Sequence, residues 1–394
     1  MKNKIPTFVL LTVFLSLSAV PAHAALITQG AVFPGSVTSG TANSQVFVGY
    51  SNSDGTLTIN SSTGGNGITE LTTSNTGGGG IVAGVGNLGD VIGTVNVIGD
   101  GTAGSASINM PNKSIDLGTD LGSAGVLNVY NGASVYAGWL TVGARNGANG
   151  AVTVHGEGSL IEIADEFGGI TVWFGSELGR TGVLVRDGGR IAALDGMYEG
   201  VIAIGANYAP PSEALVTLNN EGTLQGAVEI QQNGILQGDG GIVDGELRLF
   251  GGTLSPGLSP GTLNITGDAN LLDGLLQLEW DSPTSYDVLN IGGALTLGAD
   301  LMIDLVFSDI APTVIDLADF FNASSFDIGA FDFGTQFSAS FAPGYTGSGT
   351  ASVSFFGGEI YTVSNAVSIP EPPMSALFAL GFLGYLFKKR RQIR

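Results

Sequence analysis

The chain has 394 residues, and its 64 glycines are about twice the usual share. Cysteine is absent and histidine occurs twice, which excludes disulfides, thiolate metal sites and cysteine nucleophiles. The formal net charge of −21 excludes nucleic acid as an expected partner, because phosphate contacts need lysine and arginine. Basic residues gather at both ends of an acidic body, which indicates that the ends are targeting signals.

Residues 1–24 are typical of a secretory signal peptide. Two lysines open the segment, an apolar run follows, and small residues precede an expected cut between Ala24 and Ala25. We therefore expect a signal helix that the Sec export machinery handles, with a buried core helix as the alternative. Removal of this segment leaves His155 as the one histidine of the mature chain.

From about residue 41 to 224, pairs of apolar residues separated by one residue recur every 25 to 38 residues. The pairs are Leu57/Ile59, Val95/Val97, Leu127/Val129, Val152/Val154, Val183/Val185 and Val216/Leu218. A glycine closes a short apolar run before most pairs, at Gly49, Gly86, Gly118, Gly143, Gly175 and Gly205. Six residues after four of the pairs stands another apolar residue, at Val135, Leu160, Ile191 and Leu224.

This pattern predicts an all-β fold. Alternation of apolar and other residues is the strand period, and the intervening Gly, Asn and Asp residues are turn signals. Each unit therefore contains about three short strands, and such a unit buries its apolar face only by stacking on its neighbours. We expect a parallel β-helix, or β-solenoid, over residues 25–291. A β-sandwich with many short strands is the competing fold.

The segment from Gly251 to Leu263 reads GGTLSPGLSPGTL, and the run from Tyr286 to Asn290 reads YDVLN. These residues resemble the last coils of autotransporter passenger domains, and the upstream repeats are similar to a unit of the same proteins. The resemblance covers roughly residues 40–290, and it implies that the solenoid is right-handed.

Residues 292–368 differ in character, with alternating apolar residues from Leu295 to Leu305 and many phenylalanines. We expect a β-rich cap that covers the open end of the solenoid, since such an edge otherwise pairs with other chains. An aromatic ligand-binding or adhesive patch is the alternative.

The last segment, residues 369–394, has three parts. Pro370, Glu371 and Pro372 come first, and an apolar stretch of 14 residues follows from 374 to 387, shorter than the roughly 20 that span a bilayer comfortably. The basic cluster at the end consists of Lys388, Lys389, Arg390, Arg391 and Arg394. Basic residues beside an apolar helix stay on the cytoplasmic side, so the body would face away from the cytoplasm.

This tail resembles the PEP-CTERM sorting signal of exported bacterial proteins, which also share the upstream repeat. The resemblance implies a short transmembrane helix, an exosortase partner that cleaves near the motif, transient residence in the inner membrane, and a final place at the envelope surface or outside the cell. A plain C-terminal membrane anchor is the alternative.

Two groups of residues bear on enzyme chemistry. The repeats align His155 with Tyr130, Arg186 and Asn219, at an outward position that suits a surface ladder. Glycoside hydrolysis needs two carboxyl groups about 5–9.5 Å apart in a cleft. The acidic residues Glu157, Glu162, Asp165 and Glu166 lie close in sequence, but neighbouring strand residues point to opposite faces. We therefore expect no catalytic site.

The turns around Asp100 and Asp239 combine carboxylates with glycine, as calcium ligands do. Neither turn repeats as a nine-residue calcium motif, so we expect no cofactor, with calcium as the alternative. The chain is thus interpreted as an exported, adhesin-like structural protein of the cell surface or the biofilm matrix, with exopolysaccharide as its partner. A polysaccharide-binding or polysaccharide-cleaving β-helix is the alternative. Charged side chains that converge in a groove would favour an enzyme. Ladders of Ser, Thr and Asn would favour a structural scaffold, and clusters of Asp at the coil turns would favour calcium binding.

Overall fold

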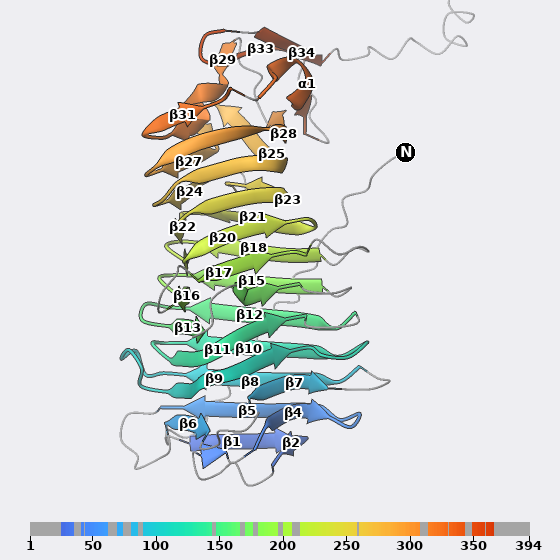
Figure 1. The fold of residues 1–394 in the computed structure, drawn as a ribbon, viewed down its shortest axis with the longest axis vertical. Helices are drawn as coiled ribbons and strands as arrows, with labels where there is room; N and C mark the ends of the chain where they lie inside the picture. Colours follow the sequence, from blue (N-terminus) through green and yellow to red (C-terminus); the bar gives the residue numbers. More distant parts are fainter. Residues whose placement is uncertain are drawn as a thin grey trace, which may run out of the picture.

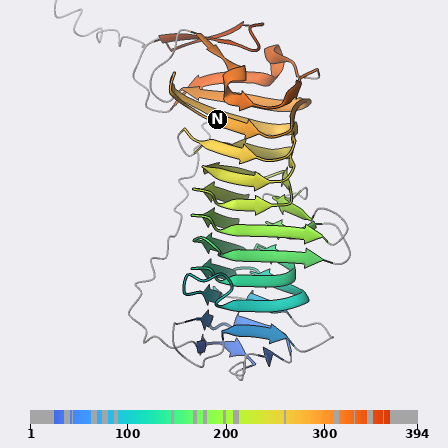
Figure 2. The same cartoon turned by 90° about the vertical axis from the view of Figure 1, so that its left-hand side faces the viewer.

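The computed structural model describes residues 25–34, 41–42, 44–61, 69–73, 80–85, 90–143, 147–165, 170–175, 180–195, 200–206, 213–257, 260–307, 314–329, 331–342, 349–358 and 360–365. These residues are nearly all β, with a short 3-10 helix η2 (Leu317–Phe320) and a single-turn helix α1 (Phe333–Gln336) near the end. One large, mostly parallel sheet winds upward in stacked coils (Figure 1), and the view turned by 90° shows the same stack (Figure 2). This arrangement is consistent with a β-solenoid.

The coils have three walls, because each strand generally pairs in parallel with the strand at the same place in the next coil. The first wall consists of β5 (Gly55–Asn60), β8 (Ile92–Ile98), β10 (Ala124–Tyr130), β12 (Asn149–His155), β15 (Arg180–Arg186), β18 (Glu213–Asn219) and β21 (Gly234–Asp239). The second wall includes β3 (Thr41–Ala42), β6 (Glu70–Thr73), β13 (Leu160–Asp165), β16 (Arg190–Asp195), β19 (Thr223–Gln225), β22 (Gly241–Asp244), β24 (Thr262–Ile265), β27 (Val288–Ile291) and β30 (Phe321–Asn322). The third wall includes β4 (Val46–Tyr50), β7 (Ile81–Val85), β14 (Ile170–Phe174), β17 (Val201–Ile204), β20 (Ala227–Gln231) and β31 (Ser325–Asp327).

Five long strands turn a corner and contribute to two walls. β9 (Ser107–Leu117) and β11 (Ser134–Val142) pass from the second wall to the third. β23 (Leu247–Ser255), β25 (Ala269–Ser282) and β28 (Ala294–Phe307) pass from the third wall to the first, where β32 (Phe337–Phe341) pairs with β28. The coils therefore continue past residue 291 into the segment expected to form the cap.

The core is a stack of in-register apolar side chains inside the three walls. Leu57 pairs with Val95, Val95 with Leu127, and the row continues through Val152, Val183 and Val216. All the predicted apolar pairs of this wall are at most 3% exposed, so the predicted alignment of the repeats is confirmed. Each such side chain contributes about 1.5–3 kcal/mol through its burial, which makes the stack the main source of stability.

A glycine corner connects the third wall to the first. The predicted glycines Gly49, Gly118, Gly143, Gly175 and Gly205 have φ between 67° and 85°, a left-handed conformation that costs other residues about 1–2 kcal/mol. Their N–H groups donate to carbonyls of the preceding coil, as from Gly143 to Leu117 and from Gly175 to Val142, so the hydrogen-bonded ladder continues around the corner. Gly86 lies outside the described residues.

The corner between the first wall and the second uses left-handed Asn and Asp residues. Asn131, Asp187 and Asn220 have φ of 55°, 55° and 48°. These three turns have three residues between strands, whereas the turn after His155 has four. The longer turn shifts the strand that follows. Leu160, the apolar residue six places after Val154, therefore pairs with Ser134, and Ile161 takes the core position in register with Val135 and Ile191.

Antiparallel strands cover the first coil. β1 (Ala25–Gly30) pairs with β5, and β2 (Val32–Phe33) pairs with β4. These pairings occupy strand edges that would otherwise be open to other chains. At the other end, β29 (Val314–Asp316), β33 (Gly349–Ser354) and β34 (Ile360–Asn365) form a separate three-stranded sheet above the coils (Figure 1).

Phenylalanines pack between the last coils and this small sheet. Six phenylalanines of this part of the chain are at most 8% exposed: Phe307, Phe320, Phe321, Phe333, Phe337 and Phe355. Phe326 and Phe356 remain 39% and 44% exposed, with ring centroids 4.9 Å apart. Most of the aromatic side chains of the segment thus fill the core, and these two lie at its rim.

The expected targeting segments lie outside the described residues. They comprise the signal helix over 1–24 with Ala24, the motif Pro370, Glu371 and Pro372, the apolar stretch, and the basic cluster from Lys388 to Arg394. Ala25 is described and begins β1, where its backbone pairs with Asn60. Among the residues that the structure describes, no helix has the length and apolar character needed to cross a membrane.

Candidate functional site

Two polar ladders run along outer faces of the solenoid. On the first wall, the amide of Asn128 donates to Asn96 at 2.9 Å and that of Asn96 to Thr58 at 3.3 Å, while the hydroxyl of Tyr130 donates to Asn128 at 3.0 Å. On the second wall, equivalent amide bonds connect three asparagines of successive coils. They join Asn322 to Asn290 at 2.7 Å and Asn290 to Asn264 at 2.9 Å. In-register stacking creates these ladders, because equivalent side chains lie one strand spacing apart.

His155 occupies the predicted outward row, in register with Tyr130 and Arg186. Its Nδ1 atom lies 2.8 Å from Oδ2 of Asp187, and both side chains are 34% exposed. The side-chain amide of Asn220 donates to Oδ1 of Asp187 at 2.6 Å. This hydrogen bond, with smaller contributions from His155 and Arg186, lowers the pKa of Asp187. The cluster ties together the turns of three successive coils, and its partially exposed groups make it a surface structure.

The structure places three of the four acidic residues considered for glycoside chemistry. Glu157 is exposed in the turn before β13, whereas Glu162 lies in β13 itself, beside Tyr136 and Ala192. Asp165 ends the same strand, where its backbone pairs with Asp195. Glu166 lies outside the described residues.

The two candidate calcium turns use their carboxylates for local hydrogen bonds. Asp100 accepts from the backbone N–H of Thr102 at 2.9 Å, and this bond lowers the pKa of its carboxyl group. Asp239 accepts from the backbone N–H of Thr262 at 3.3 Å. Within the described ranges, no three His, Asp or Glu residues are grouped in a way that could hold a metal ion.

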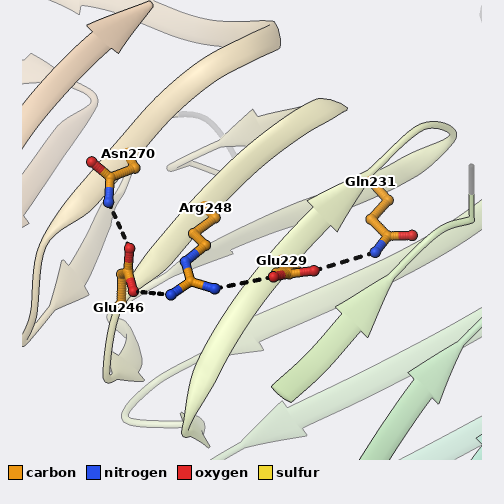
Figure 3. Close-up of polar contacts among 5 residues, drawn as sticks. All are labelled: Glu229, Gln231, Glu246, Arg248 and Asn270. Carbon is orange, nitrogen blue, oxygen red and sulfur yellow. Dashed lines mark hydrogen bonds and ion pairs between the residues drawn. The ribbon is translucent and has the colours of Figure 1, made fainter. Parts of the chain in front are cut away.

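The most connected polar network was not predicted. Arg248 in β23 reaches Oε1 of Glu229 at 3.2 Å and also pairs with Glu246, which precedes the strand (Figure 3). The amide of Asn270 donates to Glu246 at 2.6 Å, and that of Gln231 donates to Glu229 at 3.3 Å. Register explains the gathering, because Glu229, Arg248 and Asn270 are equivalent positions of three successive coils.

The electrostatics of this network are those of one cation between two anions. Arg248 is 34% exposed, and Glu229 and Glu246 are 18% and 23% exposed. The hydrogen bond to Glu246 is the largest cause that raises the pKa of Arg248, and the same contact lowers the pKa of Glu246. The arginine is thereby held in its charged form, and Glu246 stays an anion at neutral pH.

An open hollow of about 510 Å³ adjoins the network at the corner between the second and third walls. Its lining is polar and comprises Gln225, Asp244, Gly245, Glu246, Thr266, Gly267 and Asp268. Phe250 and Leu272 are each 37% exposed but are not among the residues that line the hollow. Oriented carboxylate and amide groups can bind hydroxyl groups of a ligand, and the excess of carboxylates would repel an anionic one.

Sequence reasoning missed this network because the repeat changes length there. The predicted unit ended near residue 224, whereas Glu229, Arg248 and Asn270 recur at shorter intervals than the earlier pairs. The alternation of LRLF in β23 was the available signal, since it places Arg248 and Phe250 on the outer face. Comparison of the chain with protein-family models, with curated proteins and with solved structures gives no match.

Proposed function

We propose that this protein is an exported, adhesin-like structural protein of the cell surface or extracellular matrix. The observation that carries the proposal is the outer surface of the coils, where ladders of Asn side chains, one of them ending at Thr58, run along two of the walls. A solenoid with a repeating polar face suits many weak contacts in parallel, and avidity then replaces a single tight site. A biofilm exopolysaccharide is the partner class that such contacts fit.

The proposal includes the route to this location. Residues 1–24 would direct Sec export with cleavage before Ala25, and the tail from Pro370 to Arg394 would act as a PEP-CTERM signal that an exosortase processes at the inner membrane. A right-handed solenoid belongs to the same proposal, in agreement with the general preference for right-handed connections between parallel strands.

The experiment is to determine both termini of the mature protein by intact mass and peptide mapping, separately from the envelope and from the culture medium. A chain from Ala25 to near Pro370 would support export and tail removal. A membrane-bound chain that retains Lys388 to Arg394 would contradict processing and would leave a tethered solenoid. A chain that still begins with Met1 would overturn the export proposal.

Polysaccharide binding at one defined site is the second candidate, because Glu246 of the Arg248 network also lines the hollow. Affinity electrophoresis in gels that contain neutral or anionic polysaccharides tests this candidate. We expect retardation by a neutral polysaccharide that weakens at least about tenfold in the double variant E246Q/D268N and not in E157Q, which changes an exposed turn. Equal retardation of both variants would contradict binding at this hollow.

A further inference from the structure

Two neighbouring rows of outward side chains on the first wall carry no charge. The first row consists of Thr56, Thr94, Val126, Ala151, Gly182, Leu215, Ile235 and Thr253, each in register with the next. The second row lies two residues further along each strand and consists of Thr58, Asn96, Asn128, Thr153, Leu184, Thr217, Gln237 and Ser255. Both rows flank the buried core row that begins at Leu57, so they lie on the outer face.

Outward rows of the other two walls do carry charges. Glu162 and Asp244 belong to a row of the second wall, and Glu229 belongs to a row of the third. Charged residues of the first wall stand at strand ends, as at Arg186, or in a later coil, at Asp304. The centres of protein–protein interfaces are depleted of charged residues, and the two uncharged rows have that composition in a chain with a net charge of −21.

Amide side chains of the second row donate hydrogen bonds within the wall. Asn128 donates to Asn96 at 2.9 Å, Asn96 donates to Thr58 at 3.3 Å, and Gln237 donates to Thr217 at 3.3 Å. Because these bonds run along the row, another surface can cover it without leaving those donors unsatisfied. The first row adds the apolar side chains of a valine, a leucine and an isoleucine, all half-buried.

We propose that the first wall is the interface of a homodimer, in which the two uncharged rows of one copy pack against the same rows of a second copy. Two acidic bodies repel each other, so they can pack closely only where neither presents a carboxylate. Amide ladders of this kind suit dry packing between sheets, whereas the hydroxyl groups of a sugar would need free donors and acceptors. The dimer goes beyond the proposed surface role, which the ladder of the second wall can still serve.

The dimensions of the face suit a stable dimer. The rows cross eight coils, from β5 to β23, which gives roughly 34 Å along the stack at about 4.8 Å per coil. Strands of six or seven residues give about 20 Å across it. Each copy would therefore bury roughly 700 Å² and the pair about 1,400 Å², which lies within the range of specific interfaces. Because both copies use the same surface, association closes at the dimer.

Sedimentation velocity tests the proposal on the protein expressed from its full sequence and isolated in the form that the cell delivers. We expect a monomer–dimer equilibrium with the dimer as the largest species. Added salt should strengthen the dimer, because it screens the repulsion between the two acidic bodies.

T217E should weaken the dimer at least about a hundredfold, because each copy would bury an unpaired carboxylate near the centre of the face. T223E is the matched control, because Thr223 is a half-buried outward residue of the second wall in the same coil. It adds the same charge, and it should change the dissociation constant by less than about threefold.

A single introduced cysteine gives a second measurement that adds no charge, because the chain has no cysteine of its own. The thiol of T217C should react more slowly with an uncharged alkylating reagent at concentrations that favour the dimer than after dilution. The thiol of T223C should react at the same rate under both conditions. This comparison decides the question if T217E does not fold.

A wild-type protein that stays monomeric at every concentration would overturn the proposal, and so would equal weakening by T217E and T223E. Assembly beyond the dimer would contradict the shared surface. Protection of T217C only on addition of a neutral polysaccharide would overturn the dimer and assign the first wall to that ligand. The termini of the mature protein are measured separately, so none of these results decides the export proposal.

Discussion

Replacement of Arg248 by methionine tests whether register alone creates a stabilising polar network. Methionine retains most of the apolar stem of arginine and removes the charge. Glu229 and Glu246 then face each other without the cation between them, although Asn270 and Gln231 still donate to them. We expect the three coils that carry these residues to open more readily, because a partly buried carboxylate without its cation is poorly solvated.

The magnitude follows from the exposure of the three side chains. Exposed ion pairs contribute about 0–1 kcal/mol, and removal of one partner from a fully buried pair costs about 3–5 kcal/mol. With side chains between 18% and 34% exposed, the network lies between these limits. A loss of about 2 kcal/mol is therefore expected, which corresponds to a roughly thirtyfold increase in local opening at neutral pH.

The assay is hydrogen exchange of the peptides from β20, β23 and β25 at pH 7 and at pH 3.5. The lowered pKa of Glu246 means that its contribution to wild-type stability is present above the unfolded pKa and is lost as the pH falls. The difference between R248M and the wild type should therefore shrink in acid. R186M is the matched control, because Arg186 is 46% exposed and lies 3.7 Å from Asp187. Equal effects of R248M and R186M would refute the reasoning, as would an R248M effect that does not change with pH.

Three further predictions concern the corners and the ladders, each checked by hydrogen exchange of the affected coils. G118A should destabilise its coil by at least about 2 kcal/mol, since Gly118 has φ 67° and an added Cβ would lie 2.1 Å from the carbonyl oxygen of Asn149. Its control G182A should be neutral or stabilising, because a Cβ added at Gly182 would meet no atom within 4 Å. H155A should cost less than about 1 kcal/mol, because its pair with Asp187 is partly exposed to solvent and Asn220 still donates to that carboxylate. N290A should cost about 1–2 kcal/mol, because it interrupts the ladder and removes two amide hydrogen bonds, one to Asn264 and one from Asn322.

The coil stack was predictable from the sequence because its signals are local. Apolar residues at alternate positions, as in Leu127 and Val129, define the inner face of a strand within three residues. Gly118 and Gly143 mark the left-handed corner by their chemistry alone. Repetition then placed equivalent residues in register, and it assigned His155 to the row of Tyr130 without any structural information.

The parts that escaped prediction depend on turn length and burial. One additional residue in the turn after His155 exchanges Leu160 for Ile161, because a shift of one residue moves every side chain to the opposite face. Glu229 and Arg248 become neighbours only when the coils after residue 224 are aligned at their shorter spacing. Asp287 looks like a polar turn residue in sequence, and only the packed corner reveals that it is fully buried.

The placement of charge on the surface follows from the same stacking. Equivalent residues of successive coils lie about 4.8 Å apart, so like charges at one position repel each other strongly wherever water is partly excluded. The half-buried rows accordingly contain neutral amides, as in Asn264 and Asn290, or opposite charges, as in Glu229 and Arg248. Like charges do stand in register at Asp165 and Asp195, where both strands end, and at Asp273 and Asp300. The latter two are exposed, where solvent and salt screen the repulsion. The acidic character of the protein is thus tolerated at turns and exposed edges. Asp287 is fully buried, and its burial raises the pKa of its carboxyl group to about 7.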